Sequence, residues 1–135
     1  MLFKFEYFNP SLGTITVSIA EYGLTFSRAA VEVMSKPDYI VLAFDKEKQV
    51  IGVIPTSESE PNKIEFISKL KNGYVRINNK DFIRFLMRYF QDSSEMFTGR
   101  AIRYFSYWDE DNKALIVDLK RPLDSNDDGG NETDE

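Results

Sequence analysis

The sequence predicts a small, internally duplicated α+β domain, because one strand–helix–hairpin unit is written twice between residues 23 and 122. Three features recur in each unit. An apolar strand leads into a polar helix cap, a helix carries an apolar stripe, and a hairpin enters its turn through an aromatic residue followed by aspartate. We therefore expect one domain over residues 1–123, with repeat one at about 14–55 and repeat two at about 73–122.

The first unit contains a helix over residues 28–34, because Ser27 is a good N-cap and the Lys36-Pro37 step stops a helix. A hairpin with a polar turn at 45–49 follows, and Pro55 is expected to end it. The strands expected before and within this unit share β-branched or aromatic content: 2–8, 14–20, 24–26, 39–44 and 50–54.

The second unit contains an amphipathic helix over residues 80–91, capped by Asn78 or Asn79. Its turn is expected at 109–112, and Pro122 ends its hairpin as Pro55 ends the first. Its strands are expected at 74–77, 100–108 and 113–119. Residues 63–72 mix apolar residues with lysines, so that both strand and loop stay open there.

The two hairpins align without a gap, residues 44–51 with residues 108–115. The apolar stripes of the two helices also match in spacing: Ala30, Val31 and Met34 with Phe82, Ile83 and Leu86. We therefore expect a duplication in which the second copy carries an insertion, mainly a longer helix and the linker at 93–99.

The chain has no cysteine and no histidine. This excludes disulfides, thiolate metal sites and catalysis by a Ser-His-Asp triad. A cofactor or metal is not expected, and we expect a protein that is not an enzyme. The acids Asp109, Glu110 and Asp111 lack the spacing and glycine of a calcium loop, which indicates an ordinary hairpin turn.

The net charge of −5 comes from the last twelve residues. Residues 124–135 hold six acids and no base, which predicts a disordered acidic tail that solubilises the protein or competes with nucleic acid for a basic surface. The rest of the chain is close to neutral. The N-terminus has no signal-peptide pattern, and no apolar run is long enough to span a membrane, so a cytoplasmic location and no membrane partner are expected.

The segments Glu21–Arg28 and Gly73–Lys80 each read glycine, apolar strand, polar cap and base. This pattern resembles the AbrB/SpoVT/MazE group of DNA-binding domains, and two units in one chain resemble the MraZ arrangement. Leu24 and Tyr74 follow the two glycines where that group usually has arginine. The resemblance implies a pseudo-twofold, swapped-hairpin, β-barrel-like domain with short helices, and it implies DNA binding.

A basic stripe on the second helix is the candidate DNA site, since positions 80, 84 and 88 share one helix face and could follow a phosphate backbone. A solvated helix face is the alternative interpretation. The candidate residues, including neighbours on the strands and the first helix, are Arg28, Arg76, Lys80, Arg84, Arg88, Arg100 and Arg103. Lys120 and Arg121 could widen the patch.

The aromatic run at 104–108 could stack on bases, although alternating strand aromatics more often divide between core and partner interface. Our leading hypothesis is therefore a DNA-binding transcription regulator whose partner is duplex DNA. The alternative hypothesis is a protein-binding adaptor or inhibitor, such as a phage or mobile-element accessory protein that acts on a host factor. A homodimer through exposed strand edges is a further possibility.

Overall fold

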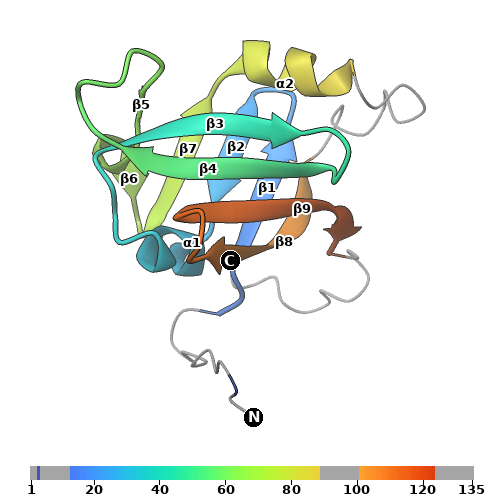
Figure 1. Cartoon of the computed structure of the whole chain (residues 1–135), viewed down its shortest axis with the longest axis horizontal. Helices are drawn as coiled ribbons and strands as arrows, with labels where there is room; N and C mark the ends of the chain where they lie inside the picture. The colour runs from blue at the N-terminus through green and yellow to red at the C-terminus, as the bar shows by residue number, and fades with distance from the viewer. Residues whose placement is uncertain (1–2, 4–12, 89–100, 124–135) are drawn as a thin grey trace.

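The computed structural model describes residues 3, 13–88 and 101–123, and their strands form one curled sheet (Figure 1). The strand order is β5-β3-β4-β9-β8-β1-β2-β7-β6. The strands are β1 (Thr16–Ala20), β2 (Gly23–Phe26), β3 (Tyr39–Asp45), β4 (Val50–Thr56), β5 (Ile64–Glu65), β6 (Leu70–Lys71), β7 (Tyr74–Asn78), β8 (Ile102–Asp109) and β9 (Ala114–Pro122). The expectation of a strand-rich, barrel-like α+β domain is confirmed at this level.

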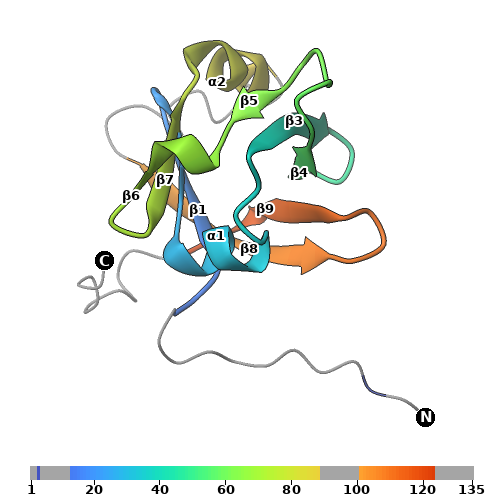
Figure 2. The ribbon, with the colours of Figure 1, turned by 90° about the vertical axis from the view of Figure 1, so that its left-hand side faces the viewer.

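The sheet curls into a half-barrel with two walls (Figure 2). Strands β3, β4 and β9 form the wall nearest the viewer in Figure 1, and β1, β2 and β7 lie behind them. Alternate residues of both walls point inward and are buried, which is the period-two pattern of strands covered on one face. The core residues contributed by these strands include Val17, Ile19, Leu24, Phe26, Ile40, Ile51, Val53, Val75, Ile77, Leu115 and Val117.

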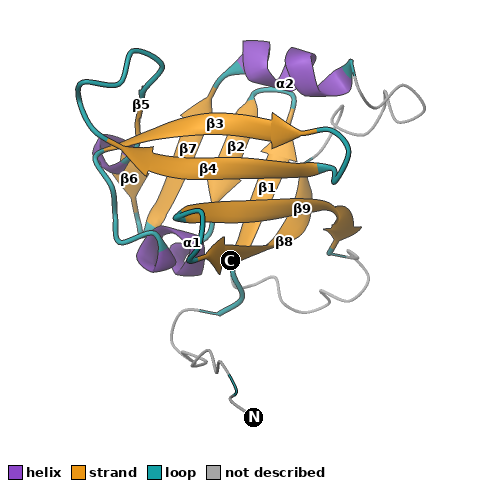
Figure 3. Ribbon diagram, in the orientation of Figure 1, coloured by secondary structure: helices purple, strands orange, loops and turns teal. Residues whose placement is uncertain are grey.

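Two short helices lie at opposite ends of the half-barrel (Figure 3). Helix α1 (Arg28–Val33) begins at Ser27, whose Oγ accepts a hydrogen bond from the Ala30 N–H at 3.2 Å. Helix α2 (Lys80–Met87) begins at Asn79, whose Oδ1 accepts from the Phe82 N–H at 3.1 Å. Both caps were predicted from the residue types, and of the two asparagines Asn79 is the one that caps.

The two long hairpins, β3–β4 and β8–β9, have turns of equal length at residues 46–49 and 110–113. The turns begin after Asp45 and Asp109, and an oxygen of each aspartate accepts a backbone N–H two residues later. The last turn residue is left-handed in both, with φ of 56° at Gln49 and 52° at Lys113. The predicted hairpin turn at 109–112 is thus confirmed, shifted by one residue to 110–113.

The stretch 63–72, for which the sequence favours neither strand nor loop, joins the two ends of the sheet. It contains β5, the 3₁₀ helix η1 (Ile67–Lys69) and β6, and it pairs with β3 on one side and β7 on the other. Phe66 is fully buried at its centre and packs edge-on against Phe26, with ring centroids 5.1 Å apart. A single large side chain therefore anchors this segment in the core.

Predicted boundaries were wrong at Pro55, at the end of helix α1, and at the end of β9, which runs to Pro122 and not to Leu119. Pro55 lies inside β4, where it is paired only with β3 because the pairing with β9 ends at Val53, so its missing N–H costs no ladder bond on the open side. Helix α1 ends at Val33, since left-handed backbone at Ser35 and Lys36 stops it before the proline. Helix α2 is described from Lys80 to Met87, with Arg88 as its C-cap.

Some predicted elements fall outside the described residues: the strand at 2–8 apart from Phe3, residues 89–91 of the predicted second helix, Arg100 at the start of the predicted strand 100–108, and the tail at 124–135. Within the described residues, no helix has the length and apolar composition needed to cross a membrane.

Tyr104 is the one fully buried residue, among those described, whose side-chain oxygen has no hydrogen-bond partner. An unsatisfied buried hydroxyl costs about 1–3 kcal/mol. We therefore expect Tyr104→Phe to raise the free energy of unfolding by about 1 kcal/mol at pH 7, measured by chemical denaturation. Ser106→Ala, which removes a buried hydroxyl that donates to the Tyr104 carbonyl, is the control and should not stabilise.

The same residue predicts a pH effect. Burial raises the pKa of Tyr104 to about 12, from an ordinary value of 10.0. The native state then holds its proton more tightly than the unfolded state, so this contribution to stability is complete below pH 10 and is lost as the pH rises toward 12. The stability advantage of Tyr104→Phe should grow over that interval, and an advantage that stays constant would contradict the assignment.

Candidate nucleic-acid interface

A polar row crosses four neighbouring strands on the outer side of the half-barrel. Arg103 on β8 is paired with Ser18 on β1, Ser18 with Thr25 on β2, and Thr25 with Arg76 on β7. Paired residues point to the same side of a sheet, and the residues on either side of each one along its strand are mostly buried core. The row therefore places two arginines on the convex surface, about 14 Å apart for three strand spacings.

Arg76 is held in place by Tyr22 in the β1–β2 turn. Its guanidinium carbon lies 4.2 Å from the centre of the Tyr22 ring, and the Tyr22 hydroxyl is 3.3 Å from Thr25 Oγ1. Burial opposes ionisation of Tyr22, but hydrogen bonds from Thr25 and Arg76 and the charge of Arg76 outweigh it and lower the pKa of Tyr22. The stacking orients the guanidinium before any ligand arrives.

Two further arginines on this side are stacked in the same way. The Arg28 guanidinium lies 5.9 Å from the Tyr74 ring centre, and that of Arg121 lies 5.1 Å from the ring centre of Phe105. Tyr74 points to the same side of β7 as Arg76, and Phe105 to the same side of β8 as Arg103. We call the surface formed by Arg28, Arg76, Arg103 and Arg121 the arginine face.

Asp118 on β9 is an acidic neighbour of the arginine face, and its carboxylate interacts electrostatically with Arg121. Among ion pairs of the described residues, none involves Arg28, Arg76 or Arg121. Asp118 on β9 pairs instead with Lys120, with its Oδ1 3.0 Å from Lys120 Nζ. These three guanidinium groups thus keep donors available for an anionic ligand.

The predicted stripe on α2 adjoins this face. An open depression of about 780 Å³ lies between Tyr22 and the first turn of the helix, and Lys80 and Arg84 line it. Both residues and Arg88, which is the C-cap, are exposed. Asp81 pairs with Arg84 at 2.7 Å on this exposed surface, which weakens the stripe as an anion site.

The structure brings Arg28, Arg76 and Arg103 together on the arginine face, with Lys80 and Arg84 next to it. Arg88 lies at the far end of α2, and Arg100 lies outside the described residues. Arg121 was named only as a possible extension of the patch, and Tyr22, Ser18 and Thr25 were not named. The alternation of Ser18 and Thr25 with apolar residues was visible in the sequence, but which strands are neighbours was not.

The aromatic run of β8 does not form a surface for base stacking. Tyr104 is fully buried and Trp108 packs partly against the core, where its Nε1 donates to Glu110 at 2.9 Å. Phe105 is covered by Arg121. Tyr107, which is paired with Ile116 on β9, is 46% exposed and is the one exposed ring of this run.

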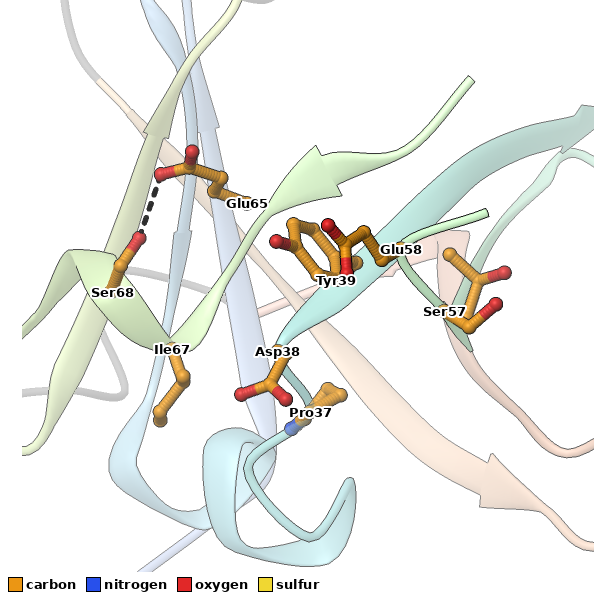
Figure 4. A pocket seen from close by; sticks show the side chains of 9 residues that line it. Pro37, Asp38, Tyr39, Ser57, Glu58, Glu65, Ile67 and Ser68 are labelled. Atoms are coloured by element: carbon orange, nitrogen blue, oxygen red, sulfur yellow. Dashed lines mark hydrogen bonds between the residues drawn. The ribbon is translucent and has the colours of Figure 1, made fainter. Parts of the chain in front are cut away.

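Acidic side chains gather on the wall away from the arginine face. An open depression of about 560 Å³ at the β3, β4 and β5 ends is lined by Asp38, Glu58 and Glu65 (Figure 4). Glu65 accepts a hydrogen bond from Ser68 at 2.9 Å. In the described part of the chain, no three acidic side chains are grouped closely enough to hold a metal ion. This depression therefore presents carboxylates, although Lys63 lies close by, over the ring of Tyr39.

The outer side of strands β3, β4, β9 and β8 carries an apolar row. Ala43 on β3 is paired with Gly52 on β4, Gly52 with Ile116 on β9, and Ile116 with Tyr107 on β8. Ala43 and Tyr107 are exposed and the two central residues are partly exposed. This row has no charged member, in contrast to the arginine face.

A search of protein families, of curated proteins and of solved structures found no match to this chain.

Proposed function

We propose that this protein binds duplex DNA through the arginine face and acts as a transcription regulator. The observation that carries the proposal is the row from Arg103 to Arg76, continued by two further ring-stacked arginines. A spacing of about 14 Å suits a B-DNA major groove about 12 Å wide, because two arginines can reach the phosphates along its edges. Lys80 and Arg84 extend the contact along α2.

The stacked rings favour duplex over single-stranded nucleic acid. Proteins that hold single strands expose aromatic rings on which bases stack. Here the rings of Tyr22, Tyr74 and Phe105 are occupied by guanidinium groups. The face is thus suited to phosphates, and we expect it to discriminate weakly between sequences.

The same proposal includes the architecture that the family resemblance implies. We propose that two repeats interleave: β1, β2, α1, β3 and β4 form one, and β5 to β9 with α2 form the other. Two-strand units from the two repeats then alternate along the sheet as β3–β4, β9–β8, β1–β2 and β7–β6. In this arrangement the segment β5–η1–β6 corresponds to β1. Strand β1 lies between the second repeat's hairpin and β2, and β5–η1–β6 lies between the first repeat's hairpin and β7.

Matching geometry supports this interleaving. The gap-free alignment of the hairpins makes Gly52 equivalent to Ile116, and these two residues are paired with each other across β4 and β9. Equivalent residues meet in this way on a twofold axis. The helix caps Ser27 and Asn79 also occupy corresponding places, each directly after a strand of the β2–β7 pair.

The test is the salt dependence of binding to a random-sequence duplex of about 20 base pairs, followed by fluorescence anisotropy. If about four phosphates are contacted, log K should fall with log salt at a slope of about −3.6, so affinity drops about 150-fold between 50 and 200 mM salt. The matched single strand serves as the comparison and should bind more weakly. An absence of binding at 50 mM salt, or a slope near zero, would remove DNA as the partner.

The apolar row favours a second candidate function, a protein-binding adaptor. Tyr107, Ile116 and Gly52 are neighbours on adjacent strands. Together they form an uncharged surface with one exposed aromatic side chain. Tyr107→Glu should then abolish capture of a protein partner and leave DNA affinity unchanged. If DNA affinity falls as well, the two surfaces are not independent.

A further inference from the structure

We infer that the acidic segment at residues 124–135 docks on the arginine face when no nucleic acid is bound, and so competes with it. The inference rests on the proposed function for its biological meaning, but the docking itself can be measured without DNA. This segment carries six carboxylates and no base within twelve residues.

The point where the chain leaves the described structure supports the docking. Leu123 is the last residue before the segment, and its N–H donates to the carbonyl oxygen of Arg103 at 2.8 Å. The preceding residue, Pro122 on β9, is paired with Tyr104, which follows Arg103 on β8. The acidic segment therefore starts beside one end of the arginine row.

The length of the segment is sufficient. An extended chain covers about 3.3–3.6 Å per residue, so that twelve residues reach about 40 Å, while Arg76 lies about 14 Å from Arg103 across the row. Asp124, Asp127 and Asp128 are the first three of the six acids, so they are nearest to Leu123 along the chain.

The acidic segment and the arginine face carry opposite charges, and the covalent link between them raises the local concentration of the segment. Arg28, Arg76 and Arg121 form no ion pair within the described residues, and guanidinium groups bind carboxylates and phosphates with the same donors. A tethered segment has an effective concentration of about 1 mM. If the detached segment bound with a Kd of about 0.1 mM, it would weaken DNA binding about tenfold.

The first experiment compares two triple variants of the full chain, each of which removes three negative charges. The tail variant carries Asp124→Ser, Asp127→Ser and Asp128→Ser, and the control carries Glu47→Gln, Glu58→Gln and Glu60→Gln on the other wall. At 50 mM salt the tail variant should bind the duplex about five- to tenfold more tightly than the wild type, and the control less than twofold. Equal tightening by both would mean that only net charge matters and would overturn the docking.

The second experiment needs no DNA. The Arg Nε–Hε and backbone amide signals of Arg76 should shift between wild type and the tail variant in ¹⁵N-correlated NMR spectra at 50 mM salt, and the difference should vanish at 500 mM. Arg76 is decisive because it lies three strands away from Leu123, where local effects of the substitutions do not reach. Unchanged Arg76 signals overturn the inference. Shifted signals in a protein that binds no DNA would support the docking and overturn the proposed function alone.

Discussion

Gly23→Ala is expected to lower the free energy of unfolding by about 3 kcal/mol or more, the largest effect that we predict for a single substitution. Gly23 has φ of 149°, a conformation that side chains disfavour, and a Cβ at this position would lie 1.9 Å from the Ile77 carbonyl oxygen. The methyl group would push β2 away from β7, next to the Asn79 N–H that donates to Tyr22 at 2.8 Å. Thermal unfolding followed by circular dichroism should show a fall in Tm of about 12 °C or more.

Gly52→Ala is the matched control for this substitution. Gly52 lies in the middle of β4 with ordinary backbone geometry, and its nearest neighbour would be Ala43 Cβ at 3.9 Å. The expected change is within about 0.5 kcal/mol. If both alanine variants unfold at the wild-type temperature, the close approach of β2 to β7 is not as described.

Arg76→Ala combined with Arg103→Ala is expected to weaken duplex DNA binding about 60-fold at 0.1 M salt. Each phosphate contact that the substitutions remove forgoes counterion release at a slope of about −0.9, or about 1.2 kcal/mol at that salt concentration. The slope of log K against log salt should also become about 2 units less steep. Anisotropy titrations at four salt concentrations measure both quantities.

The control removes two cations from the opposite wall, Lys46→Ala with Lys48→Ala in the β3–β4 turn. Neither lies on the arginine face, so affinity should fall less than threefold and the slope should not change. A further comparison separates the arginine face from the helix stripe: Arg84→Ala with Arg88→Ala should cost less than the Arg76 and Arg103 pair, because Asp81 already engages Arg84. The reverse ranking would assign the DNA site to α2.

Much of the fold could be predicted from local chemistry. Ser27 and Asn79 were identifiable as caps because their side-chain oxygens satisfy the first helical N–H groups, and this requirement depends on no distant residue. The two hairpins were also visible, since Asp45 and Asp109 fix their turns through bonds to nearby backbone. Caps and turns depend on residues only a few positions apart, and they can therefore be predicted from a single sequence.

The remainder of the fold depended on distant partners. The stretch 63–72 forms strands of only two residues each, which are too short to show a period, and what fixes it is Phe66 packing on Phe26. Pro55 was expected to end its strand, yet β4 continues because no strand lies on the side where the proline lacks its N–H. Both features follow from which strands become neighbours.

The candidate site was predictable in part for the same reason. Arg76 and Arg103 could be named from their charge and strand context, but the row that joins them passes through Ser18 and Thr25, two small polar residues of separate strands. In the sequence Tyr22 is only an interruption between strands, although its ring holds Arg76. Predicting this surface requires the strand register, and no spacing in the sequence encodes it.

The strand order also has a consequence for folding kinetics. Thr16 must pair with Phe105, and Val50 with Asp118, before the sheet is complete. The β3–β4 and β8–β9 hairpins are local and can form in about 1–10 µs, but neither can be placed until most of the chain has been synthesised and collapsed. Because folding slows as contacting residues lie farther apart in sequence, we expect refolding over milliseconds to seconds, with hairpin formation well ahead of closure of the sheet.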